Sequence, residues 1–157
     1  MNFIDEAYLE VRAGDGGSGA SSFRREKYIP FGGPDGGDGG KGGDIFFKVN
    51  QNSNTLIDFQ NRKIFEAKNG QRGSGKNKSG SAGDDLFIGV PKGTVIYDNL
   101  TNEELIDCTD ENIDYLIVKG GEGGHGNARF KSSTNRAPRK STPGFKGEIR
   151  SLRLELK

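Results

Sequence analysis

Glycine recurs at every third position in several parts of this chain, and that interval restricts the fold more than any other feature of the sequence. It is kept by Gly33, Gly36, Gly39 and Gly42, and by Gly120, Gly123 and Gly126. Three residues per turn is the period of a polyproline II helix, and glycine at this interval leaves one face of that helix without side chains. We therefore expect these glycines to be structural and several short segments to pack together as a stiff shaft. The alternative is a flexible linker, which has no reason to be periodic.

The stretches between the glycine tracts have the pattern of β-strands. Apolar residues alternate with polar ones, or form short β-rich runs, within residues 8–12, 44–49, 56–59, 64–65, 86–90, 95–97, 113–118 and 152–156. Alternation of period two, broken by frequent turns, predicts a mainly β fold of the antiparallel sandwich or barrel type. At 157 residues the chain has the length of one domain, which we place at residues 1–157.

Composition narrows the class of protein further. Hydrophobic residues make up 31% of the chain, so the apolar core must be small. No apolar run is long enough to span a bilayer, and the acidic start of the sequence does not resemble a signal peptide. The single cysteine, Cys108, cannot form a disulfide within the chain, so nothing indicates an oxidising compartment. We expect a soluble cytoplasmic protein without a membrane span.

Charge is segregated along the chain although the formal net charge is only +1. Residues 24–27, 68–78 and 129–146 together hold thirteen basic residues and one acidic residue, a net charge of +12. The remainder holds ten basic and 21 acidic residues, a net charge of −11. An acidic body with separate basic segments is typical of a protein that binds a polyanion through those segments.

These basic segments contain the candidate contacts to RNA. Lysine and arginine neutralise phosphates, and hydroxyl and amide side chains donate hydrogen bonds to phosphate oxygens. The predicted RNA-binding residues are Arg24, Arg25, Lys27, Arg72, Lys76, Lys78, Arg129, Lys131, Arg136, Arg139, Lys140 and Lys146. Arg24 and Arg25 adjoin Glu26, so an internal bracing role stays open for them. We expect the 129–146 segment to dominate, with Phe130 as its anchor rather than as a platform for a base.

Three short motifs resemble nucleotide or metal sites, and each lacks a required part. Residues 14–19 match the dinucleotide pattern GxGxxG, but the preceding strand is only half apolar and no helix signal follows. Residues 70–77 resemble a phosphate-binding P-loop, but Asn77 stands where a hydroxyl must bind magnesium. Residues 39–47 match one calcium-binding nonapeptide, a motif that works only in tandem copies.

No residue pattern indicates catalysis or a metal site. His125 is the only histidine, so no histidine pair or triad can form, and we expect it to be a turn or shaft residue. The 22 acidic residues form no pair in a predicted cleft, and we interpret most of them as a solvated face. The sequence thus predicts no catalytic residue, metal ligand or cofactor within this chain.

Several long blocks of the sequence resemble the Obg family of GTPases. They are SFRREKY at 22–28 with GGPDGGDGGKGGD at 32–44, DLFIGVPKGT at 85–94, GGEGGHGNARF at 120–130 with residues 135 and 137–138, and residues 147–157. The resemblance covers essentially the whole chain. It implies the Obg fold, a β-barrel-like base with a protruding bundle of glycine-rich polyproline-II-type helices.

The resemblance also implies a function. Obg proteins act in large-subunit ribosome assembly and in stress signalling, including the stringent response, and this domain places its loop tips against ribosomal RNA near the peptidyl-transferase centre. Their GTPase domain, which binds GTP and magnesium, follows this domain, so we expect no enzymatic activity from these 157 residues. The implied partners are the large ribosomal subunit and its RNA. Two alternatives stay open: a regulatory module that docks a protein partner or the GTPase domain, and a nucleotide enzyme that uses the 70–77 loop.

Overall fold

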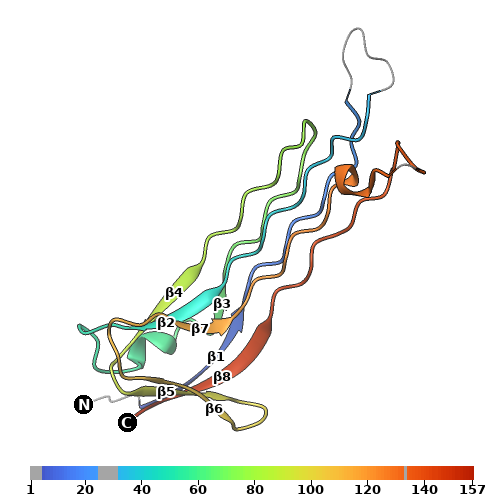
Figure 1. Cartoon of the computed structure of the whole chain (residues 1–157). Coiled ribbons are helices and arrows are strands. Elements are labelled where there is room, and N and C mark those ends of the chain that lie inside the picture. Colours follow the sequence, from blue (N-terminus) through green and yellow to red (C-terminus); the bar gives the residue numbers. More distant parts are fainter. Residues whose placement is uncertain (1–4, 25–31, 133) are drawn as a thin grey trace.

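The computed structural model describes residues 5–24, 32–132 and 134–157. A small base of β-strands carries a long shaft of extended segments, and the chain runs up and down this shaft several times (Figure 1). The described elements are β1 (Glu6–Arg12), β2 (Ile45–Val49), η1 (Ile57–Phe59), β3 (Ile64–Glu66), β4 (Leu86–Val90), β5 (Thr94–Asp98), β6 (Glu104–Cys108), β7 (Tyr115–Val118), η2 (Asn127–Phe130) and β8 (Ile149–Leu156), where η marks a 3-10 helix.

The described strands form two open sheets in the base. Five strands pair in the order β3-β1-β8-β5-β6, and three pair in the order β4-β2-β7. The prediction of a mainly β fold is confirmed, but these strands do not close into a barrel. Residues 56–59, expected as a strand, contain the 3-10 helix η1 instead, and β6 was not predicted at all.

The apolar core lies between the strands of the base. Val11, Ile45, Phe47, Ile96 and Leu154 come from four different strands, and all are completely buried. Burial of one such side chain stabilises the fold by about 1.5–3 kcal/mol. Among the described residues of 14–44, 68–85 and 119–148, none belongs to the core cluster. The shaft must therefore be held together by something other than apolar packing.

The direction in which each strand meets the shaft explains the mixture of parallel and antiparallel pairs. β1 and β3 both lead into ascending segments of the shaft and pair in parallel. β2 and β4 both receive descending segments and also pair in parallel. β8 receives a descending segment and pairs antiparallel with β1. The expected all-antiparallel arrangement is therefore wrong, because neighbouring strands inherit the directions of the segments that they continue.

Backbone hydrogen bonds link the segments of the shaft at every third residue. The described segments are residues 13–22, 33–44, 67–74, 79–85, 119–127 and 141–148. The N–H groups of Gly14, Gly17 and Ala20 donate to the carbonyl oxygens of Gly43, Gly40 and Gly37 at 2.8–2.9 Å. Those three glycines donate in turn to Lys68, Gln71 and Ser74 at 2.8–2.9 Å. Residues 33–44 also donate to residues 121 and 124 and accept from residues 80 and 83. This segment therefore bonds to four neighbours, whereas a strand of a flat sheet bonds to two at most.

Glycine is required in the shaft because the backbones lie in contact. A Cβ added to Gly123 would lie 1.8 Å from the carbonyl oxygen of Gly39, and one added to Gly36 would lie 2.0 Å from that of Ala20. Gly39, Gly42, Gly120 and Gly126 are enclosed in the same way. Gly33 differs, since the nearest atom to its added Cβ is Lys131 Nζ at 3.7 Å. Among the described glycines only Gly93 has a left-handed φ, 91°, so the shaft glycines serve close approach rather than turn formation.

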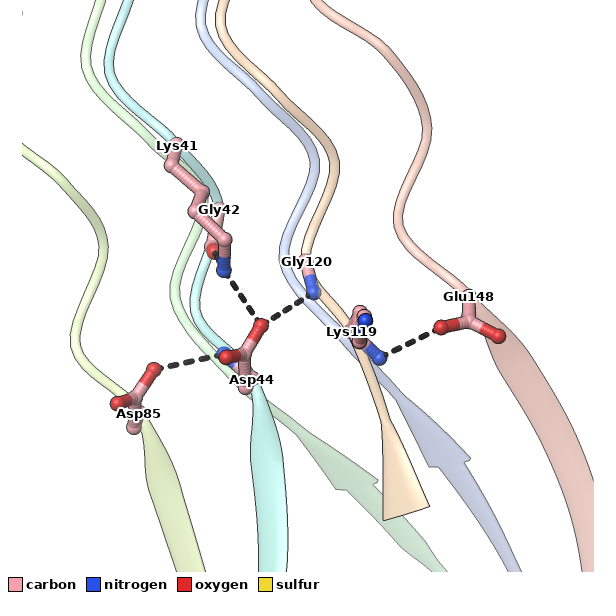
Figure 2. A network of polar contacts seen from close by, with 7 residues as sticks. All are labelled: Lys41, Gly42, Asp44, Asp85, Lys119, Gly120 and Glu148. Atoms are coloured by element: carbon pink, nitrogen blue, oxygen red, sulfur yellow. Dashed lines mark hydrogen bonds and ion pairs between the residues drawn. The ribbon is translucent and has the colours of Figure 1, made fainter. Parts of the chain in front are cut away.

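Acidic side chains cap backbone amides where the base meets the shaft (Figure 2). Asp44 Oδ1 accepts hydrogen bonds from Lys41 Nζ at 2.5 Å and from Gly120 N–H at 2.7 Å. The N–H of Asp44 donates to Asp85 Oδ1 at 2.8 Å. Burial raises the pKa of Asp44, but the hydrogen bonds from Lys41 and Gly120 outweigh burial and hold the pKa below its ordinary value of 3.8. Asp44 therefore ties neighbouring segments together as a carboxylate.

We expect Gly123→Ala to lower the free energy of unfolding by about 1–3 kcal/mol, the cost of overpacking a closely packed site. The single added methyl group has no room beside Gly39, so the two segments must separate. Thermal unfolding followed by circular dichroism measures the loss. Gly33→Ala is the matched control and should melt like the wild type, because its Cβ meets only the end of the Lys131 side chain at an ordinary contact distance of 3.7 Å. Equal melting of all three proteins would mean that the segments do not pack as described.

Asp44→Asn should lower the free energy of unfolding at neutral pH by about 2 kcal/mol, the contribution of hydrogen bonds to a charged acceptor. Because the folded-state pKa of Asp44 is depressed, its stabilisation is present above pH 3.8 and is lost as the pH falls below that value. The gap between wild type and variant should therefore narrow in acid, as measured by urea unfolding across pH. Asp58→Asn, on the exposed η1 surface, is the control at neutral pH. A gap of constant size across pH would contradict the role of the carboxylate.

Candidate functional site

The basic residues predicted to bind RNA are distributed over the shaft, and most of the described ones lie toward the end that is remote from the base. The turn at residues 75–78 and the segment from η2 to residue 141 both lie at this end (Figure 1). Phe23 and Pro34 form an isolated β-bridge there. We call this end of the described chain the tip. Arg25 and Lys27 lie outside the described residues.

The 75–78 turn has a backbone conformation that residues other than glycine rarely adopt. Lys76 and Asn77 have φ values of 61° and 57°, and Lys78 N–H points back to Gly75 O at 3.4 Å. Two successive left-handed residues make a hairpin turn of type I′, which ordinarily favours Asn or Gly. Asp35 holds the turn: its Oδ2 accepts Lys76 N–H at 3.0 Å and its carbonyl oxygen accepts Asn77 N–H at 2.7 Å. The exposed Lys76 side chain is therefore carried on a braced turn.

Asn127 joins the third basic segment to the shaft. Its side chain is completely buried, and its Oδ1 accepts Gly36 N–H at 2.8 Å. Its Nδ2 donates to Ser22 O at 2.8 Å and to Pro138 O at 3.1 Å. One amide thus satisfies backbone groups from three segments. Loss of one partner of a buried hydrogen bond costs about 1–3 kcal/mol, so this residue fixes the loop that carries Arg136 to Lys140.

Arg129 is engaged within the molecule, unlike the cations that follow it. Its Nη2 lies 2.6 Å from Asp38 Oδ2, while Asp38 Oδ1 accepts Gly126 N–H at 2.9 Å. The hydrogen bond from Arg129 lowers the pKa of Asp38, and the Gly126 amide adds to this against the effect of burial. Arg129 therefore braces the start of the loop, although it was predicted to contact RNA.

The remaining cations of this loop are exposed, and two lie over aromatic rings. The Arg139 guanidinium lies 6.0 Å from the centre of the Phe23 ring, and Lys140 Nζ lies 5.2 Å from that of Phe130. Phe130 also meets the edge of His125. It thus anchors the loop, as we favoured, but to the shaft and not to the apolar core. Among the described residues, no acidic partner is found for Lys131, Arg136, Arg139 or Lys140.

Two of the predicted cations lie lower on the shaft. Lys146 Nζ is 3.8 Å from Asp15 Oδ2, and the next residue, Gly147, packs on the backbone of Ala13 at the base. Arg72 is exposed beside Gly73, which bonds to the middle of the first segment. Lys78 is exposed at the 75–78 turn, and Arg24 is exposed at the tip. At the tip, the structure therefore brings together Arg24, Lys76, Lys78 and the cations of the loop that follows η2. Lys146 and Arg72 lie apart from them, lower on the shaft.

The nucleotide-like motifs have their backbone amides occupied. In the 70–77 loop, Gly73 N–H donates to Ser18 O and Lys76 N–H to Asp35. These amides cannot cradle a phosphate as a P-loop does, so the loop does not fit GTP. In the GxGxxG motif, Gly14 and Gly17 donate to the neighbouring segment. In the calcium-like motif at residues 39–47, the carboxylate of Asp44 already accepts hydrogen bonds from Lys41 and Gly120.

Acidic residues have a larger structural role than the sequence indicated. Asp15 Oδ1 accepts Gly147 N–H at 2.8 Å, and Asp35, Asp38 and Asp44 each accept amides of other segments. The interpretation of the acids as a mostly solvated face is therefore wrong for these four. Their position within the glycine tracts, each next to a glycine, is the signal that could have identified them.

Other classes of site find little support in the described part of the chain. Burial raises the pKa of the Cys108 thiol to about 12, so it stays protonated and unreactive. No group of three His, Cys, Asp or Glu side chains within the described residues is placed to hold a metal ion. No described helix combines the length and apolar character needed to cross a membrane.

Comparison with known proteins gives a consistent result along the whole length. The family model described as GTP1/OBG matches residues 4–157. A curated relative, the protein named GTPase Obg of Psychrobacter sp. (strain PRwf-1), is 55% identical over 157 residues. The match covers 100% of this chain and 39% of the relative, so the chain spans well under half the length of that protein.

Proposed function

Because the chain belongs to the GTP1/OBG family, we propose that it is the RNA-binding domain of a GTPase that acts in assembly of the large ribosomal subunit. The shaft carries its basic tip into the tRNA-binding region of the subunit, near the peptidyl-transferase centre. Hydrolysis of GTP, with magnesium, belongs to a part of the full-length protein outside these 157 residues. We place that protein in the cytoplasm and connect it with the stringent response.

One observation carries this proposal. Exposed cations gather at the end of a shaft that is held by backbone hydrogen bonds, and Lys131, Arg136, Arg139 and Lys140 have no acidic partner among the described residues. Cations that are not neutralised internally are available to phosphates, whose neutralisation supplies most of the nonspecific affinity for nucleic acid. A stiff shaft delivers them into a narrow site at little cost in conformational entropy.

The conformation of the shaft segments is part of the same proposal. We assign them the polyproline II conformation, supported by the period of three in both glycine position and hydrogen bonding. Gly126, at the end of one segment, has φ −73° and ψ 161°, close to polyproline II values. This conformation leaves each N–H and C=O directed outward to a neighbouring segment instead of along its own axis.

A second function, docking of a protein partner, is favoured by one observation. The outer face of the three-stranded sheet exposes Phe87 and Leu116 by 47% and 40%, and Phe46 stacks on Phe87 with ring centres 5.1 Å apart. Apolar docking on this face would keep its affinity as salt rises, whereas phosphate contacts weaken steeply. A salt titration of large-subunit binding separates the two functions.

Replacement of Arg136, Arg139 and Lys140 together by Gln should weaken co-sedimentation with the large ribosomal subunit. It should also reduce the magnitude of the salt slope of binding by up to about 3, if each cation meets one phosphate. The affinity is measured by sedimentation across a series of salt concentrations.

The matched control replaces Lys48, Lys63 and Lys92 by Gln. These lysines are exposed in the base, so the control removes the same formal charge and leaves the tip intact. If the control weakens binding as much as the tip variant does, affinity follows total charge and the tip is not the RNA-binding site.

A further inference from the structure

A cavity of about 900 Å³ lies at the tip, beside the braced turn. Its wall includes Ser22, Phe23, Asp35, Gly75, Lys76 and Asn77. The volume is in the range of sites that bind small ligands. Phe23 supplies an aromatic ring, and the other side chains supply hydrogen-bonding groups and a cation. The cavity therefore combines an aromatic surface for stacking with polar groups for hydrogen bonding.

One oxygen of Asp35 has no hydrogen-bond partner among the described residues. Asp35 is only 8% exposed, and its Oδ2 accepts Lys76 N–H, but no donor in the described part of the chain reaches the buried Oδ1. A buried acceptor that lacks a hydrogen bond costs about 1–3 kcal/mol. An external donor that reaches Oδ1 would remove this cost when it binds, so the site is selective for a ligand with a donor group.

Gly75 leaves the cavity wall beside this buried oxygen without a side chain. A Cβ built on Gly75 would lie 2.9 Å from Ser22 Oγ and 3.8 Å from Asp35 Oδ1. The φ of Gly75 is not left-handed, so its backbone does not require glycine. The missing side chain instead leaves space beside two oxygens in the wall of the cavity.

The surroundings indicate which donor fits. Lys76 lies in the wall, and no group of three metal-ligating side chains exists among the described residues, so a metal ion is disfavoured. An aromatic ring beside a carboxylate and a lysine fits a nucleotide: base stacking on an aromatic side chain contributes about 1–3 kcal/mol, and lysine neutralises the phosphate.

We propose that this cavity receives one unstacked base of the bound RNA, stacked near Phe23, with its exocyclic amino group donating to Asp35 Oδ1. The inference rests on the proposed RNA-binding function and adds base selectivity to it. Adenine, cytosine and guanine carry such an amino group. Uracil carries carbonyl oxygens beside its only ring N–H, and a carboxylate repels them. The tip therefore prefers amino-bearing bases at one position.

The test is titration of the ¹⁵N-labelled chain with short oligoadenylate and oligouridylate, followed through the amides of Ser22, Gly75 and Lys76. Both probes carry the same phosphate backbone, so their difference isolates the base. We expect roughly tenfold tighter binding of oligoadenylate, the effect of one hydrogen bond to a charged acceptor.

Two variants make the test specific. Asp35→Asn keeps an oxygen for Lys76 N–H and turns an amide NH₂ toward the cavity, so the preference for oligoadenylate should fall or reverse. Gly75→Ala adds a methyl group beside Ser22 Oγ and Asp35 Oδ1. It should weaken oligoadenylate binding without loss of the turn, which circular dichroism and the Lys76 amide shift report.

Equal binding of the two probes by the wild type, no shift of these amides with either probe, or an unchanged preference in Asp35→Asn would each overturn the inference. Large-subunit co-sedimentation separates this failure from failure of the proposed function. If the wild-type chain binds the subunit with a steep dependence on salt but shows no base preference, only the proposal for the cavity fails. The proposed function then stands.

Discussion

Direct hydrogen bonding between extended backbones, with no side chain between them, is the interaction on which this structure depends. A glycine at each contact lets a carbonyl oxygen approach to where a Cβ would stand, as at Gly123 against Gly39. A segment inside the array, such as residues 33–44, can then donate to more than one neighbour, so the array extends in two directions instead of one. The shaft gains its stiffness from these bonds, since the apolar core is confined to the base.

The polar side chains of the shaft follow from the same constraint. With little side-chain packing available, amides that lack a backbone acceptor must be satisfied by short acidic or amide groups, and Asp15, Asp38, Asp44 and Asn127 do this. Because these aspartates accept hydrogen bonds inside the shaft, the acidic residues and the basic residues have different roles. The acids hold the shaft, while Lys131, Arg136, Arg139 and Lys140 have no acidic partner among the described residues.

Some parts of this architecture could be predicted from the sequence and others could not. The glycine interval indicated the shaft and period two indicated most strands, because both patterns are local. β6 was missed because only Leu105 and Ile106 mark it within an acidic stretch. The parallel strand pairs depend on which shaft segment each strand continues, which no local pattern contains. Of the tip, the exposed cations were predicted, but the internal ion pair of Arg129 and the roles of Asp35 and Asn127 arise from contacts between distant segments.

Amide hydrogen exchange across residues 38–43 tests the central claim most directly. Gly39, Gly40, Gly42 and Gly43 donate to neighbouring segments, whereas the amides of Asp38 and Lys41 have no acceptor within the described chain. If the shaft is a hydrogen-bonded array, the four glycine amides exchange slowly and the two intervening amides exchange rapidly, in a pattern of period three. Rapid exchange at all six positions would contradict the account, because it would mean that these segments are loose linkers.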